Sequence, residues 1–284
     1  MKIWILENKK IFNELDEIIV KVDFNNKIGF HCYSSWEKLG QRPMSTLRKD
    51  LKTFKSEMIA IAWKDAFIFQ NYKESSGFKF LNHSFFLHDL TSFSSNTLKL
   101  KLSGDKDNDL DLVSSEGRSF SKLRLDANYK YNFDEFLSFW KEIGINQRKV
   151  EYIEDPIFWD EDNYKKLIDH KVPIALDQIF NNQQIVLNVG EKLVLKPMLQ
   201  SVNSAFYKKC IFSHNMNGIL SDWQTFCELL RLGDMNEIHG VASNSTFDNK
   251  LLFLPNGEYV EVNTELIKAV YDYLYCLRNW ERVV

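Results

Sequence analysis

The stretch LRLDAN, residues 123–128, decides the fold because it combines a strand pattern with a carboxylate at the strand's end. Leu123 and Leu125 share one face of the strand, whereas Arg124 and Asp126 share the other. If helices cover the leucine face, the charged face must point into a barrel. The sequence therefore predicts an α/β fold with a β/α barrel, in which Asp126 ends an inward-facing row of side chains.

Short strands with a similar pattern recur along the chain, separated by segments long enough for a helix. This alternation is typical of βα units with a parallel sheet. The clearest helix is predicted in NFDEFLSFWKEIGI, with Asn132 as N-cap and Gly144 as a stop signal. The acidic stretch 104–112 is interpreted as a solvated loop. Besides LRLDAN, the predicted strands are TLKLKL (97–102), VEYIED (150–155), VPIALD (172–177) and KLVLKP (192–197).

The two ends of the chain depart from this pattern. EIIVKVDF (17–24) and GFKFLNHSFF (77–86) predict strands, and the segment 46–69 predicts a helix. An amphipathic helix with its N-cap at Asn263 or Thr264 is predicted near the C-terminus. The expected domains are an α+β capping domain, 1–89, completed by the segment 262–284, and a barrel domain, 90–261.

Composition limits the classes of function. The 284 residues include 44% hydrophobic residues, enough for a large core, and the net charge of −3 gives no footprint for nucleic acid or an anionic membrane. Four dispersed cysteines without a CxxC pair indicate neither disulfides nor a thiolate zinc site, and they favour a reducing cytoplasm. No apolar run approaches the roughly 18 residues that span a bilayer. We expect a cytoplasmic protein with a small-molecule ligand and an oligomeric state left open, a monomer included.

Charged residues end each predicted inward face. Successive charged residues are separated in the sequence by about one βα unit. In barrels of this kind, active sites form at the carboxyl ends of the strands. These side chains should therefore ring one mouth of the barrel. The series is Lys101, Asp126, Glu154, Asp177 and Lys196.

The carboxylates of this series predict a metal site. A single Asp after a strand is usually a turn former or a helix cap. Three carboxylates in register at a partly buried place would repel one another, however, and a divalent cation would supply the missing charge. Ligands that are all oxygen favour Mg²⁺ or Mn²⁺ over zinc. Asp126, Glu154 and Asp177 are therefore predicted metal ligands.

The lysines of the series predict acid and base chemistry. Lys99 lies one inward position before Lys101, and this second cation could hold Lys101 partly neutral, as a general base requires. Lys196 would then face Lys101 across the metal. The alternative for the KLK pattern alone is an edge strand with a solvated lysine face.

Taken together, LKLKL, LRLDAN, VEYIEDPIF, VPIALDQ and VLKP, in this order, resemble the enolase superfamily. The resemblance is to its muconate lactonizing enzyme branch, and most closely to the o-succinylbenzoate synthase family of menaquinone biosynthesis. It implies a modified β/α barrel with an α+β cap, and Mg²⁺ bound by Asp126, Glu154 and Asp177. It implies further that Lys101 and Lys196 are the catalytic lysines of a hydro-lyase, a dehydratase that forms o-succinylbenzoate from a cyclohexadiene carboxylate. Lys101 would abstract the α proton, and Lys196 would stabilise the enediolate.

Supporting and substrate-contacting residues follow less directly from the motifs. Lys99 and Asn128 are expected to support the site, and FSHNMNG, which replaces a serine-rich stretch of the family, leaves Ser213 and Asn215 as weak candidates for substrate contacts. Of the six histidines, His214 alone is expected at the mouth. Further expectations concern Gln178, which replaces a usual Glu, a substrate-contacting cap segment at 31–43 with Ser34 and Ser35, and the weaker contacts Asn244 and Ser245.

Two alternative functions remain open. An N-acylamino acid racemase or a dipeptide epimerase would share the ligands and both lysines, but would use the lysines as bases on opposite faces of the substrate. A degenerate barrel that acts as a binding protein is the alternative without catalysis. The complete set of five charges disfavours it, because a scaffold gains nothing from clustering them.

Overall fold

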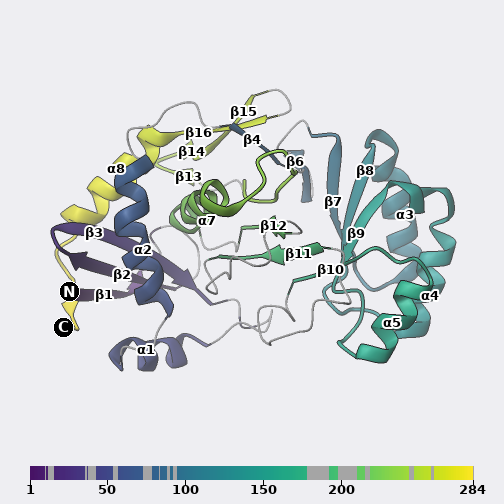
Figure 1. Cartoon of the computed structure of the whole chain (residues 1–284), viewed down its shortest axis with the longest axis horizontal. Coiled ribbons are helices and arrows are strands. Elements are labelled where there is room, and N and C mark those ends of the chain that lie inside the picture. Colours follow the sequence, from purple (N-terminus) through teal and green to yellow (C-terminus); the bar gives the residue numbers. More distant parts are fainter. Residues whose placement is uncertain are drawn as a thin grey trace.

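The computed structural model of the chain contains two units with a central helix between them (Figure 1). An antiparallel sheet with its helices lies at one end, a parallel sheet backed by helices lies at the other, and α7 (Ile219–Leu232) lies between them. No helix in the described part of the chain is long and apolar enough to cross a membrane. The structure describes residues 1–9, 11, 16–35, 37, 43–53, 57–72, 79–82, 84–87, 90–91, 95–177, 192–197, 210–214, 218–242, 246–256 and 259–283.

The parallel sheet contains every strand predicted around LRLDAN. Its order is β12-β11-β10-β9-β8-β7-β5-β6, and only the β5–β6 pair is antiparallel. The predicted parallel pairing is therefore confirmed. The strands are β5 (Ser84–Leu87), β6 (Leu90–Thr91), β7 (Thr97–Lys101), β8 (Lys122–Asp126), β9 (Val150–Glu154), β10 (Ile174–Leu176), β11 (Lys192–Leu195) and β12 (Cys210–Phe212).

Residues 239 and 240 connect the two sides of this sheet. His239 forms an isolated parallel bridge with Asn82, just before β5, and Gly240 forms one with Ser213, just after β12. The sheet is therefore a half-barrel whose sides approach each other through single bridges. A complete ring of strands stays a prediction.

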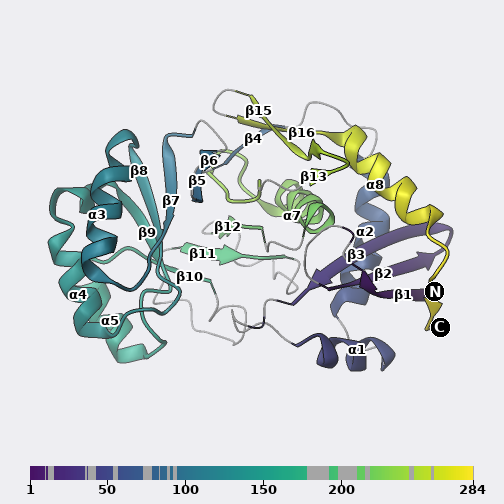
Figure 2. The same cartoon turned by 180° about the vertical axis from the view of Figure 1, so that it is seen from behind.

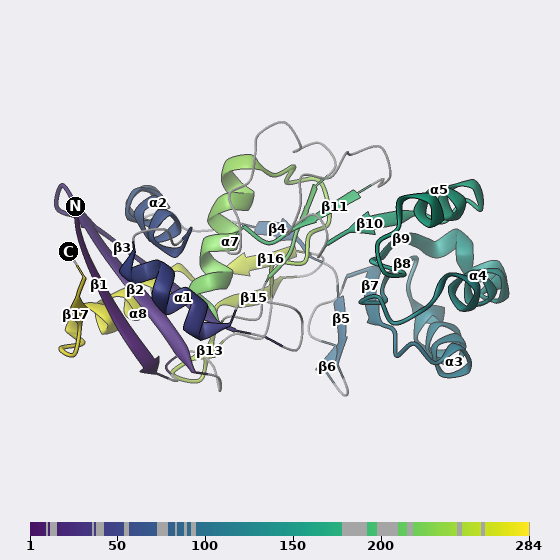
Figure 3. The same ribbon diagram turned by 90° about the horizontal axis from the view of Figure 1, so that it is seen from below.

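Helices cover the outer face of the sheet, as the leucine face of LRLDAN predicted (Figure 3). Asn132 caps α4 through a capping box, since its side chain accepts from the N–H of Glu135 at 2.9 Å and the Glu135 side chain accepts in return from the Asn132 N–H. Gly144, with φ +60°, follows the end of α4, so the predicted cap and stop are both confirmed. The elements on this side are α3 (Lys106–Glu116), α4 (Phe133–Glu142), α5 (Glu161–Asp169) and the short 3-10 helices η2 (Gly117–Ser119) and η3 (Gly144–Lys149).

The interpretation of residues 104–112 as a solvated loop is wrong, because most of them form α3. The Asp105 side chain caps this helix, accepting a hydrogen bond from its first turn at 3.0 Å. Asp109 is buried, and it accepts hydrogen bonds from the N–H groups of Ser103 at 2.7 Å and Gly104 at 3.0 Å. Because backbone donors satisfy this carboxylate, it does not need water.

The antiparallel sheet of the N-terminal unit has the order β17-β1-β2-β3 and is buried on both faces. One face packs on α1 and α2, so the single helix predicted over 46–69 is in fact two helices. The other face, with Phe30, packs on α8. The elements are β1 (Lys2–Lys9), β2 (Glu17–Phe24), β3 (Lys27–Ser34), α1 (Met44–Lys52), α2 (Glu57–Tyr72), α8 (Thr264–Cys276) and β17 (Glu281–Arg282).

The C-terminal segment returns to the N-terminal sheet (Figure 2). The Asn263 side chain accepts from the N–H of Leu266 at 3.1 Å, so the predicted N-cap of the last helix is confirmed. β17 then pairs with β1 in antiparallel fashion. The division into domains at residues 89 and 90 stays a prediction, although β5, which precedes it, already pairs with β7.

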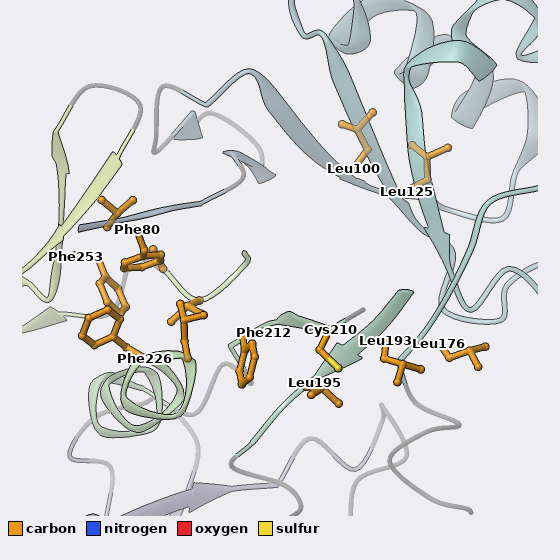
Figure 4. Close-up of a cluster of buried hydrophobic side chains, with 14 of the residues drawn as sticks. Phe80, Leu100, Leu125, Leu176, Leu193, Leu195, Cys210, Phe212, Phe226 and Phe253 are labelled. Carbon is orange, nitrogen blue, oxygen red and sulfur yellow. The ribbon is translucent and has the colours of Figure 1, made fainter. Parts of the chain in front are cut away.

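Aromatic residues link α7 to a small three-stranded sheet (Figure 4). The ring centroid of Phe80 lies 5.3 Å from that of Phe226 and 5.6 Å from that of Phe253. These rings belong to one apolar core, which continues beneath the helices of the parallel sheet. The small strands are β4 (Lys79–Leu81), β15 (Phe253–Asn256) and β16 (Tyr259–Val262), with the hairpin β13 (Thr246–Phe247) and β14 (Lys250–Leu251).

A buried carboxylate, Asp65 of α2, lies where the two units meet. Its Oδ2 accepts hydrogen bonds from the N–H of Phe30 at 2.8 Å and from the hydroxyl of Tyr271, and its Oδ1 has no partner among the described atoms. Burial raises the pKa of Asp65 to about 7, against the opposing effect of these hydrogen bonds. Gln224 of α7 completes the junction, since its Oε1 lies 2.8 Å from Nδ1 of His31.

Candidate active site

Five charged residues lie at the carboxyl ends of neighbouring parallel strands, as their spacing predicted. Strand pairing places Lys101 opposite Asp126 and Asp126 opposite Glu154. Asp177 directly follows β10 and Lys196 directly follows β11, the next strands of the same sheet. The structure therefore brings all five together at the edge of the sheet where active sites of such barrels form.

The alternation of LRLDAN explains why these charges face inward. Leu123 and Leu125 are buried in the core beneath the helices. Arg124 is buried on the opposite face, where its guanidinium carbon lies 4.8 Å from the ring centroid of Tyr152. Tyr152 packs there with Ala175, Val194 and Ile211, a separate cluster inside the sheet. The charged ends of the strands lie above this cluster.

Lys99 bridges two of the carboxylates. Its Nζ lies 2.7 Å from Oε2 of Glu154 and 3.2 Å from Oδ2 of Asp126, and the side chain is buried. Burial lowers the pKa of Lys99, but the two carboxylates outweigh this effect and hold the pKa well above its ordinary value. Lys99 is therefore a fixed cation of the site.

Lys101 lies at the edge of the same cluster. Its Nζ is 4.0 Å from Oδ2 of Asp126, and its side chain is 42% exposed, which leaves it open to a ligand. Burial lowers the pKa of Lys101; Lys99 and Lys196 lower it further, whereas Asp126 raises it. The net shift is in the direction that a general base requires.

Lys196 shows the opposite shift. Its ammonium group contacts Oδ2 of Asp177 directly. Burial lowers the pKa of Lys196, but the charge and hydrogen bond of Asp177 outweigh burial, and the pKa lies above its ordinary value. Lys196 is thus held protonated, as a group that stabilises negative charge should be. The pKa values of the two lysines predicted as catalytic are therefore shifted in opposite directions.

The carboxylates also differ from one another. Glu154 is 1% exposed, and burial together with the charges of Asp126 and Asp177 raises its pKa to about 7, with Lys99 opposing. Burial raises the pKa of Asp126, but Lys99 and Lys101 lower it more, so the net shift is downward. Asp126 is also held by Asn128, whose Nδ2 donates to Oδ1 at 2.5 Å.

The predicted ligands have the oxygen atoms that a hard divalent cation prefers. All three predicted ligands are carboxylates, and Oε1 of Glu154 is buried without a hydrogen-bond partner among the described atoms. In this structure the ammonium groups of Lys99 and Lys196 lie against oxygens of Asp126 and Asp177. Within the described ranges, no group of three or more His, Cys, Asp or Glu residues is gathered closely enough to hold a metal ion. Asp126, Glu154 and Asp177 would hold Mg²⁺ once it replaces part of this lysine contact.

Ser213 and His214 follow β12 directly and lie beside the site. Ser213 is buried, and its N–H donates to the carbonyl of Leu195 at 2.9 Å, which fixes it beside Lys196. Burial lowers the pKa of the next residue, His214, to about 3, and the charges of the three site lysines contribute. His214 therefore stays neutral near these lysines. The sequence placed it at the mouth, but its spacing from other residues did not predict a metal ligand. Several expected contacts lie outside the described residues, namely Asn215, Gln178, Asn244 and Ser245.

The cap segment 31–43 was expected to be a loop that contacts substrate; the loop assignment is wrong for residues 31–34, and the substrate contact stays a prediction. His31–Ser34 belong to β3 and are buried. Burial lowers the pKa of His31 to about 4, with its bond to Gln224 opposing. Residues 36 and 38–42 lie outside the described ranges. The buried part of this segment connects the cap to α7.

Comparison with known proteins supports the resemblance inferred from the motifs. No family model matches the chain. The chain is similar to the o-succinylbenzoate synthase of Bdellovibrio bacteriovorus, with 26% identity over 213 residues, which cover 66% of this chain and 63% of the relative. The match thus spans less than two thirds of the relative's own length.

Solved structures share the fold along nearly the whole chain. A mandelate racemase/muconate lactonizing enzyme from Sorangium cellulosum is similar with a TM-score of 0.69 and 13% identity, covering 93% of this chain and 94% of its own. A dipeptide epimerase from Enterococcus faecalis gives 0.67 and 11%, covering 91% and 95%. The o-succinylbenzoate synthase of Thermosynechococcus elongatus, solved with Mg in its active site, gives 0.57 and 14%, covering 92% and 91%. The chain therefore shares the fold of these solved structures, and the resemblance to o-succinylbenzoate synthases is confirmed.

Proposed function

We propose that the chain is a Mg²⁺-dependent dehydratase that forms o-succinylbenzoate from its cyclohexadiene carboxylate precursor. The observation that carries the proposal is the placement of Lys101 and Lys196 beside three carboxylates at one edge of the parallel sheet. The similarity to the Bdellovibrio synthase supports this reaction over others that use the same fold. A cytoplasmic location and a role in menaquinone biosynthesis are parts of the same proposal.

Lys101 would act as the base. Its lowered pKa and its 42% exposed side chain suit removal of the proton α to the substrate carboxylate. The ammonium group that results could then donate the same proton to the departing hydroxide, which leaves as water. One residue on one face of the substrate would thus serve both half-steps.

Lys196 and Lys99 would supply fixed positive charge. Lys196 places an ammonium group at the same edge of the sheet, so it can stabilise the negative charge that develops on the substrate after proton loss. Lys99 neutralises Asp126 and Glu154 at 3.2 and 2.7 Å. When bound, Mg²⁺ would add charge stabilisation at the substrate carboxylate. Asp126, Glu154 and Asp177 would hold this ion.

A racemase or epimerase of the same superfamily is the second candidate. The shared fold with the Enterococcus dipeptide epimerase and the presence of two site lysines favour it. Such an enzyme needs both lysines to exchange protons. The sequence similarity to the Bdellovibrio synthase supports the one-base dehydratase instead.

A turnover assay tests the proposal. The purified protein is incubated with Mg²⁺ and the cyclohexadiene precursor, and the loss of diene absorbance is followed. We expect turnover that EDTA abolishes and that Lys101→Ala lacks. Racemisation of N-acylamino acids without loss of the diene would replace the dehydratase with the second candidate. Neither activity in a folded, metal-loaded protein would favour a binding function.

A further inference from the structure

Asp155 has an unusual backbone conformation for a buried residue beside the site. It directly follows Glu154 at the end of β9 and is 1% exposed. Its φ of +43° lies in the left-handed region, which a residue with a side chain adopts only at a cost in free energy. Asn128 and Tyr129, in the loop after β8, are also left-handed, with φ of +46° and +60°. Strained residues thus gather where two site strands end.

Hydrogen bonds of Asp155 connect three strand ends. Its N–H donates to the carbonyl of Ala175 at 3.2 Å, and its carbonyl accepts from the N–H of Tyr129 at 2.9 Å. Its side-chain Oδ1 accepts from the N–H of Asp177 at 3.1 Å. The residue directly after β9 therefore holds the loop after β8 on one side and the end of β10 on the other.

These contacts connect Asp155 to each predicted metal ligand. Asp177 is held directly by the Asp155 carboxylate, and Glu154 is its chain neighbour. The loop that Asp155 holds at Tyr129 also contains Asn128, whose side chain donates to Asp126. Asp155 therefore acts on the site through the residues that it holds.

We propose that Asp155 is a positioning residue that sets the relative placement of Asp126, Glu154 and Asp177, the side-chain hydrogen bond to Asp177 being the decisive contact. The inference rests on the proposed function, since it assumes that these carboxylates hold a divalent cation. The left-handed backbone of Asp155 is then the cost of turning its carboxylate toward the amide of the next strand end. Residues that orient metal ligands commonly change metal affinity about 10- to 100-fold when they are replaced.

Three variants separate the side chain from the backbone. Asp155→Gly removes the acceptor but suits the left-handed conformation. Asp155→Asn keeps an acceptor oxygen and also tolerates this conformation. Asp248→Gly is the matched control, because Asp248 is exposed and has a φ of +50°. It repeats the same substitution at the same kind of backbone position, in the β13–β14 turn.

Manganese affinity, followed by electron paramagnetic resonance, is the main measurement, with melting temperature as the check on folding. We expect Asp155→Gly to weaken Mn²⁺ binding about tenfold or more, Asp155→Asn to restore it to within about threefold, and Asp248→Gly to leave it unchanged. Hydrogen exchange of the Asp177 amide should be faster in Asp155→Gly alone. Mn²⁺ affinity in Asp155→Gly equal to that of the unmodified protein would overturn the proposal.

Two further outcomes keep this inference separate from the proposed function. If the unmodified protein binds Mn²⁺ but does not convert the cyclohexadiene precursor, the proposed reaction fails and the affinity ratio of the variants still decides the role of Asp155. If the unmodified protein binds no Mn²⁺, the positioning of metal ligands by Asp155 is overturned together with the metal site.

Discussion

Asp65 couples the stability of the protein to pH, and Asp65→Asn should remove this coupling. Burial raises the pKa of Asp65 to about 7 in the folded chain, from an ordinary value of 3.8. A folded pKa above the unfolded one means that the unfolded chain releases this proton at lower pH. The free energy of unfolding therefore falls as the pH rises through the interval between the two values.

The size of the effect follows from the shift. From 3.8 to about 7 is about 3 pH units, and at 1.36 kcal/mol per unit this amounts to about 4 kcal/mol in total. Since the folded and unfolded chains titrate at different pH, roughly 2 to 3 kcal/mol of this falls between pH 5 and pH 8. Glu154, whose pKa is also raised to about 7, adds an effect of the same sign, and His31, whose pKa is lowered to about 4, adds one of opposite sign.

Urea unfolding at a series of pH values isolates the contribution of Asp65. The quantity to compare is the free energy of unfolding of the unmodified protein minus that of Asp65→Asn, because the effects of Glu154 and His31 occur in both. We expect this difference to fall by roughly 2 to 3 kcal/mol from pH 5 to pH 8. Asp248→Asn, at an exposed position, serves as the control. A difference that stays constant over this range would refute the assignment of a raised pKa to Asp65.

Further predictions concern the site and one helix. Replacing any one predicted metal ligand should weaken Mg²⁺ binding by more than about tenfold while the fold survives; calorimetry decides this, and unchanged affinity removes that residue from the ligand set. Lys101→Ala and Lys196→Ala should each lower kcat at least about 100-fold. With an unreactive product-like ligand, only Lys196→Ala should retain deuterium exchange at the α carbon, and the reverse result would assign the base to Lys196. Asn132→Ala should lower the free energy of unfolding by about 1 kcal/mol through loss of the capping box, and an unchanged urea midpoint would contradict this. The ligand variants are Asp126→Asn, Glu154→Gln and Asp177→Asn.

Short-range patterns explain what the sequence could predict. The alternation of Leu123 and Leu125 with charged residues gave the orientation of the strand, and the distance to the next strand gave the parallel order, because both depend only on neighbouring residues. Asn132 and Gly144 marked the ends of a helix for the same reason. The gathering of the site charges followed from these elements without any knowledge of side-chain contacts.

Long-range contacts explain what the sequence could not predict. Asp109 belongs to an acidic run that suggested water, yet it is buried against the backbone of Ser103 and Gly104. Asp65 accepts a hydrogen bond from Tyr271, which lies 206 residues further along the chain, and no local pattern marks such a pair.

Lys99 was expected mainly to lower the pKa of Lys101. In the structure Lys99 bridges two carboxylates, and this contact depends on how three strands are placed relative to one another. The arrangement of strands could be read from the spacing of residues, but the choice of ion-pair partners within the site could not.

The pairing of β17 with β1 and the packing of α8 on the N-terminal sheet bear on how the protein is made. A ribosome releases β1, β2 and β3 long before the segment that covers Phe30. The rings of Tyr271 and Tyr275, whose centroids lie 5.4 Å from that of Phe30, are therefore absent while most of the chain is synthesised. Until then one apolar face of the sheet lacks its cover, which exposes the nascent chain to aggregation. For the same reason, the cap cannot be expressed as an isolated N-terminal fragment without leaving this face open to water.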